Sequence, residues 1–138
     1  MQENKENSEA WRMLGQLFQE NDQDNFAIIA LREAHAADPY DLDSLLALGV
    51  SCTNENDRQD AYHYLHLWLK YHPDFNSLPG VQENAEMEYN AIRAAFEQAH
   101  SIKPQDTQVL LALGVLSFIQ ANFELAGEYF VKAIKENP

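Results

Sequence analysis

The sequence has little of several residue types on which other protein classes depend. Its 138 residues include one cysteine, five glycines and five prolines. The lone Cys52 excludes an internal disulfide and fits a reducing compartment such as the cytosol. So few glycines and prolines argue against a loop-rich or all-β protein. No apolar run approaches the ~18 residues of a membrane-spanning helix, so we predict a soluble, intracellular chain without direct membrane insertion.

Basic residues are also scarce. Nine lysines and arginines stand against 22 aspartates and glutamates, which gives a formal charge of −13. A surface this acidic repels phosphate backbones and anionic lipid headgroups, so we expect no nucleic-acid partner. Cationic segments of other proteins are better candidate partners.

Self-similarity is the most informative feature that is present. Prolines recur in steps of 34, 31 and 34 residues, and a Leu-Gly pair recurs in the same frame. The prolines are Pro39, Pro73, Pro104 and Pro138, and the pairs are Leu14-Gly15, Leu48-Gly49 and Leu113-Gly114. A period of about 34 residues with these features is the tetratricopeptide pattern. It predicts an all-α fold, a right-handed superhelix of stacked antiparallel helix hairpins.

The physical basis of the pattern is the packing of paired amphipathic helices. Each hairpin buries its apolar faces only by stacking on its neighbours. Gly15 and Gly49 fall where the two helices of a hairpin approach most closely. Trp11 and Trp68 are expected to fill the space between hairpins.

One repeat departs from the pattern. Pro79-Gly80 stands where the Leu-Gly pair belongs, and apolar residues recur at helical spacing over 81–101 without glycine or proline. We therefore predict one long helix at about 81–101 after an irregular stretch. The predicted parts are a disordered or artificial lead-in at 1–7, two regular repeats at 8–75, a degenerate repeat at 76–106 and a regular repeat at 107–138.

The groove-lining positions of the second repeat carry the chemistry of a peptide site. Asn54 has one acceptor and two donors, so it can hold the backbone of an extended peptide. Thr53 adds a hydroxyl and Val50 an apolar floor. The bland alternative is that Asn54 and its neighbours only cap their helix, since such residues are ordinary in solvated turns.

Carboxylates surround these positions. Glu55 follows Asn54 directly, and the neighbouring turns add an acidic edge made of Glu20, Asp22 and Asp57. A groove of amides edged by carboxylates suits an extended peptide that carries a lysine. The fourth repeat has Phe118 and Ile119 at the matching groove positions and no amide there.

The run from Leu46 to Glu55, Leu-Ala-Leu-Gly-Val-Ser-Cys-Thr-Asn-Glu, resembles the peroxisomal import receptor family peroxin-5. Ala-Trp-Arg-Met-Leu-Gly at 10–15 and the segment 65–73 support the resemblance, which covers about residues 9–138. The family reads C-terminal targeting signals of the Ser-Lys-Leu type. The resemblance implies that Val50 and Thr53 line the signal-peptide groove together with Asn54.

The same resemblance also implies the partners and the cellular location of the protein. It implies cargo signals of peroxisomal (glycosomal) matrix proteins as partners, and docking peroxins that bind through regions absent from this chain. It implies a cytoplasmic receptor that cycles to the peroxisomal (glycosomal) membrane, uses no cofactor and catalyses nothing. The family's carboxylate-binding residues belong to repeats outside this chain, so the chain is expected to hold half a site.

Three alternatives stay open. A generic tetratricopeptide interaction scaffold is one, because this fold hosts many partners. A co-chaperone clamp for acidic tails needs several bases, whereas the groove positions offer only Arg12. A metal protein would need more ligands than His63 and His66, which we expect to face solvent, and Cys52 occupies a packing position.

Overall fold

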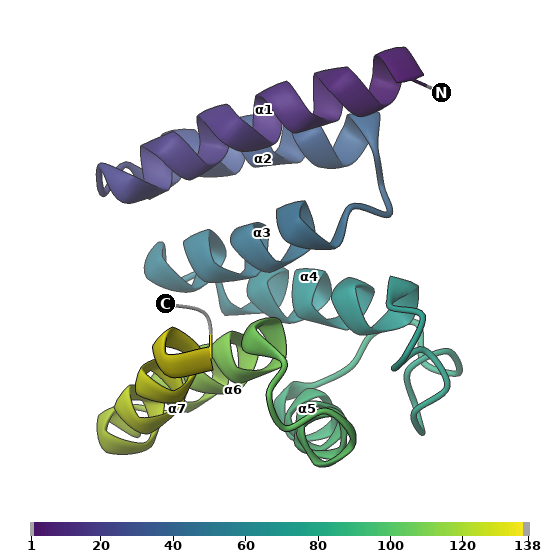
Figure 1. The fold of residues 1–138 in the computed structure, drawn as a ribbon, viewed down its shortest axis with the longest axis vertical. Coiled ribbons are helices and arrows are strands. Elements are labelled where there is room, and N and C mark those ends of the chain that lie inside the picture. The colour runs from purple at the N-terminus through teal and green to yellow at the C-terminus, as the bar shows by residue number, and fades with distance from the viewer. Residues whose placement is uncertain (1, 137–138) are drawn as a thin grey trace. The chain divides into compact units, whose positions relative to one another are not determined.

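The computed structural model describes residues 2–136, all of whose regular elements are α-helices. The chain forms two compact units, residues 1–71 and 72–138, and their helices are labelled in Figure 1. The helices are α1 (Gln2–Glu20), α2 (Asp24–Ala37), α3 (Leu42–Asn54), α4 (Arg58–Tyr71), α5 (Tyr89–Ile102), α6 (Thr107–Ile119) and α7 (Phe123–Glu136). The all-α class with antiparallel helix hairpins is confirmed.

The first unit is two hairpins stacked side by side. Helix α1 pairs with α2 and α3 pairs with α4, while α2 packs against α3 and joins the hairpins. Close approach depends on glycine, because a Cβ on Gly15 would lie 2.6 Å from Cγ of Leu31. A Cβ on Gly49 would lie 3.0 Å from Cδ2 of Leu65. The two glycines therefore lie where the sequence pattern places the closest contact of each hairpin.

Short turns end the first helix of each hairpin at the same side of this unit. Asp22 has φ 59° and Asn56 has φ 62°, the left-handed conformation that aspartate and asparagine tolerate better than most residues. After α3, the amide of Asp57 donates to the carbonyl of Cys52 at 2.8 Å. These turns bring the C-terminal end of α3 beside the N-terminal end of α2.

The second unit consists of the α6–α7 hairpin with α5 packed against α6. Asp106 caps α6 by accepting the amides of Gln108 and Val109 at 2.9 and 3.1 Å. The Tyr89 hydroxyl donates to the carbonyl of Leu116 at 3.1 Å and fastens the start of α5 to α6.

The helix expected at about 81–101 is shorter than predicted. It begins only at Tyr89, and the preceding residues form turns in which Gly80 has φ +83°. Val81 and Met87 are buried in this irregular segment, whereas Ala85 is exposed. The apolar residues before Tyr89 therefore belong to a packed turn region. The prediction of a helix over 81–88 was wrong.

Three further expectations need correction. Residues 2–7 belong to α1, so the lead-in expected over 1–7 is helical where it is described, and Met1 lies outside the described residues. Trp11 is 39% exposed and does not fill a space between hairpins of the first unit, where α1 packs mainly on α2. Trp68 is fully buried as expected. His63 is exposed, but His66 is buried on α4, where a polar side chain occupies a packed position.

Candidate functional site

The predicted peptide-binding residues gather at the C-terminal end of α3. Val50 and Thr53 are half-buried and Asn54 is exposed at the last position of the helix. Glu55 is the residue that caps the helix, and its amide donates to the carbonyl of Ser51 at 3.0 Å. Residues three and four positions apart share a helix face, so Val50, Thr53 and Asn54 form one continuous strip.

The Thr53 hydroxyl is already used as a donor. Its Oγ1 donates to the carbonyl of Gly49, one turn earlier, at 2.8 Å. A hydroxyl has one hydrogen and two lone pairs, so Thr53 in this rotamer offers a ligand only an acceptor. Val50, which precedes it by one turn, supplies the apolar part of the strip.

Asn54 does not cap its own helix in this structure. Its side-chain Nδ2 donates to Oδ2 of Asp24, at the start of α2, at 3.3 Å. One amide hydrogen is thereby engaged, which leaves a second hydrogen and the carbonyl oxygen for a ligand. The contact joins the two hairpins of the first unit at the strip.

A series of hydrogen bonds connects α1 and α2 to the C-terminal half of α3, next to Asn54. Gln19 Nε2 donates to the carbonyl of Ala47 at 2.8 Å and to Oγ of Ser51 at 2.7 Å. Ser51 Oγ in turn donates to Oδ1 of Asp24 at 2.9 Å. Helices α1, α2 and α3 are therefore linked within one hydrogen-bonded network, which the sequence pattern did not reveal because its members are far apart in the chain.

The predicted acidic edge lies on the two turns beside this strip. Glu20 ends α1, Asp22 lies in the α1–α2 turn and Asp57 lies in the α3–α4 turn, and all three are exposed. Asp57 Oδ1 accepts the amide of Asp60 at 3.2 Å, which orders the turn. Exposed carboxylates at adjacent turns attract a cationic side chain, although each exposed pair contributes only about 0–1 kcal/mol.

Arg12, the groove base noted in the sequence, is neutralised by carboxylates. Its Nη1 lies 2.7 Å from Oδ2 of Asp43, its Nε lies 3.7 Å from Oδ2 of Asp41, and its Nη2 lies 3.8 Å from Oε1 of Glu9. The six residues Ser8, Glu9, Arg12, Asp38, Asp41 and Asp43 line a small cavity of about 160 Å³. An arginine held this way is a poor receptor for a carboxylate, which argues against a clamp for acidic tails here.

The matching end of α6 is apolar. Phe118 is 46% exposed, and its ring packs edge-on against the ring of Phe123 with 5.3 Å between the ring centroids. Ile119 is buried. Gln120 caps the helix through its backbone. The second unit therefore lacks a side-chain amide at the position that Asn54 occupies in the first.

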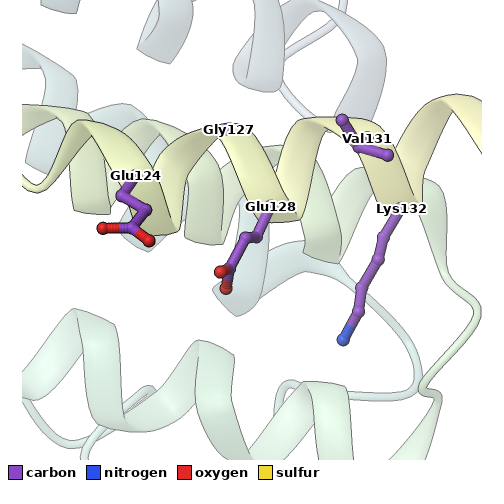
Figure 2. Close-up of a pocket in the computed structure, with 5 residues that line it drawn as sticks. All are labelled: Glu124, Gly127, Glu128, Val131 and Lys132. Atoms are coloured by element: carbon purple, nitrogen blue, oxygen red, sulfur yellow. The ribbon is translucent and has the colours of Figure 1, made fainter.

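A second depression, of about 510 Å³, lies along α7 and is lined by Glu124, Gly127, Glu128, Val131 and Lys132 (Figure 2). Figure 2 shows the two glutamates and the lysine pointing to the same side of α7, whereas Val131 points away from them. Both charge signs share this surface, and an amide is not among its lining residues. It therefore differs from the strip on α3, which ends in the side-chain amide of Asn54.

Two other chemistries find no support. Burial raises the pKa of the Cys52 thiol to about 12, so it is protonated and inert at neutral pH. Among the described residues, no three histidine, cysteine or acidic side chains are grouped so that they could hold a metal ion. Within residues 2–136, no helix has the length and apolar character needed to cross a membrane.

The hairpins define a tetratricopeptide-repeat protein, and comparison with known proteins supports this class. The crystal structure of MamA has a similar fold, with a TM-score of 0.56 at 22% identity over 94% of this chain and 78% of the other. No family model matches the chain.

Sequence comparison then gives the family. The chain is 43% identical to Peroxisome biogenesis protein 5 of Arabidopsis thaliana over 124 residues, 89% of this chain and 17% of the relative. It is 31% identical to the Peroxisomal targeting signal receptor of Yarrowia lipolytica, over all of this chain and 25% of the relative. The chain belongs to the peroxin-5 family, and it spans a quarter or less of the length of these relatives.

Proposed function

We propose that this chain forms part of a receptor for C-terminal Ser-Lys-Leu-type targeting signals of peroxisomal (glycosomal) matrix proteins. The signal binds as an extended peptide along the strip at the end of α3. The observation that carries the proposal is the grouping of Val50, Thr53 and Asn54 on one face beside exposed carboxylates, in a chain of this family.

Each group has a chemical task in the proposal. Val50 contacts an apolar part of the peptide, and the Thr53 oxygen accepts from a peptide N–H. Asn54 holds the peptide backbone through its exposed amide, and Glu55 adds negative charge next to it. The acidic edge of Glu20, Asp22 and Asp57 favours the lysine of the signal by long-range attraction.

The wider role follows from the family and extends beyond this chain. The complete receptor binds cargo in the cytoplasm and cycles to the peroxisomal (glycosomal) membrane, where docking peroxins bind its other regions. The signal's carboxylate is held by residues outside this chain. The role is one of binding and transport, without catalysis or a cofactor.

A co-chaperone function is the alternative that the geometry disfavours. A clamp for acidic tails uses free basic groups that hold two carboxylates. Arg12 is instead engaged by Asp43 at 2.7 Å and lies close to two more carboxylates.

The test compares peptides that differ only in their last residues, by fluorescence anisotropy with this chain and with the complete receptor. We expect the peptide ending in Ser-Lys-Leu to bind the complete receptor, and an equal peptide ending in Glu-Glu-Val-Asp to bind at least tenfold more weakly. Replacing the signal's lysine with glutamate should also weaken binding, and the loss should shrink at high salt. Equal binding of all three peptides would refute the proposal.

A further inference from the structure

Asp24 joins two donors of α3 through one carboxylate. Its Oδ1 accepts from Oγ of Ser51 at 2.9 Å, and its Oδ2 accepts from Nδ2 of Asn54 at 3.3 Å. Asp24 is the first residue of α2, where a carboxylate is also favoured by the helix dipole.

The hydrogen-bond directions in the network are fixed by chemistry. Ser51 is fully buried and accepts from Gln19 Nε2 at 2.7 Å, so its own hydrogen is free to go to Asp24. An ionised carboxylate can only accept, so both partners of Asp24 must donate. Hydrogen bonds arranged in series polarise one another, which strengthens the arrangement.

This order decides which way the Asn54 amide points. The NH₂ group must face Asp24, because the carbonyl oxygen of Asn54 would be repelled by the carboxylate. The oxygen Oδ1 is consequently on the other side of the amide. An asparagine without such a neighbour presents either end to a ligand with little preference.

We propose that Asp24 is a positioning residue for Asn54, which it holds so that Oδ1 accepts an N–H from the bound peptide. This deepens the function proposed above and rests on it for the identity of the ligand. Asp24 acts through Asn54, because each of its two oxygens accepts a side-chain donor of α3. In this proposal the signal's lysine is attracted by the acidic edge of Glu20, Asp22 and Asp57.

The first experiment needs no peptide. The side-chain NH₂ signals of Asn54 are followed by amide NMR in the wild-type chain and in Asp24→Asn, a variant of the same shape without the charge. We expect the Asn54 signals to lie at different chemical shifts in Asp24→Asn than in the wild type, because the carboxylate that accepts from Asn54 Nδ2 is replaced by an amide. Glu33→Gln is the control, because it removes one negative charge from an exposed position of the same helix. Asn54 signals that are the same in Asp24→Asn and in Glu33→Gln would overturn the proposal.

The second experiment measures signal-peptide affinity in the complete receptor. We expect Asp24→Asn to weaken binding about threefold, and the double variant Asp24→Asn/Asn54→Ala to bind no more weakly than Asn54→Ala alone. Independent, additive losses would overturn the positioning role, since two residues that act as one cannot be additive. Circular dichroism of each variant separates these results from unfolding.

The two experiments fail separately. If the wild-type receptor does not bind the peptide, the proposed function is refuted, and the ligand-free Asn54 signals still decide whether Asp24 positions the amide. If the peptide binds but the Asn54 signals do not depend on Asp24, the proposed function stands and the positioning role is refuted.

Discussion

Two glycines of the α6–α7 hairpin provide a matched test of how the hairpins hold together. Both lie inside helices, where glycine is less stable than alanine by about 1 kcal/mol. A Cβ on Gly114 would lie 2.4 Å from Cε1 of Phe130 and 2.8 Å from two further ring atoms. A Cβ on Gly127 would meet no heavy atom of the described residues within 4 Å.

The two alanine variants should therefore change stability in opposite directions. Gly114→Ala gains about 1 kcal/mol of helix propensity, but forcing the Phe130 ring aside costs about 3 kcal/mol, at the upper end for overpacking. Gly127→Ala keeps the gain without the cost. We expect a net loss of about 2 kcal/mol for the first and a net gain of about 0.5–1 kcal/mol for the second.

Urea unfolding followed by far-UV circular dichroism measures both variants against the wild type. Because each changes glycine to alanine in the same hairpin, differences in the unfolded chain cancel to a good approximation. If Gly114→Ala proves as stable as Gly127→Ala, the close approach of α6 and α7 at Phe130 is not what requires glycine at this position.

Three further predictions follow from the structure. Asn54→Ala should weaken signal-peptide binding in the complete receptor by about 1 kcal/mol, or roughly fivefold, as measured by anisotropy; an unchanged affinity would remove Asn54 from the site. The amides of residues 76–88, which form turns, should exchange with solvent faster than those of α3 and α4, and mass-spectrometric hydrogen exchange that finds equal protection would contradict this. Because the pKa of the Cys52 thiol is raised to about 12, iodoacetamide should not label it at pH 8 (about four units lower) until urea unfolds the chain, and prompt labelling of the folded chain would contradict its burial.

The repeat pattern predicts the hairpins well because it records close packing. Gly15 opposite Leu31 and Gly49 opposite Leu65 are contacts within one hairpin, so a single period contains both partners. The segment before α5 could not be predicted in the same way. Val81 and Met87 are buried there without being helical, and helical spacing of apolar residues cannot distinguish this from a helix.

The sequence could propose residues for the candidate site, and their role in binding stays a prediction, but it could not reveal the hydrogen bonds that hold them in place. Val50, Thr53 and Asn54 could be proposed together because they lie close in the sequence on one expected helix face. The roles of Gln19 and Asp24 depend on the packing of α1 and α2 against α3, over separations of 27 to 32 residues. Glutamine and aspartate are common surface residues, so nothing in the sequence distinguishes Gln19 and Asp24 as partners in these hydrogen bonds.

The proposed function depends on the binding of a targeting signal to the strip at the end of α3. We would titrate this chain, and an extended chain from the same receptor, with a peptide that ends in Ser-Lys-Leu and follow both by two-dimensional amide NMR. We expect shifts centred on Val50, Thr53 and Asn54 in the extended chain, and none there with a peptide that ends in Glu-Glu-Val-Asp. Signal-peptide binding to the extended chain that leaves these three residues unshifted would contradict the proposed function.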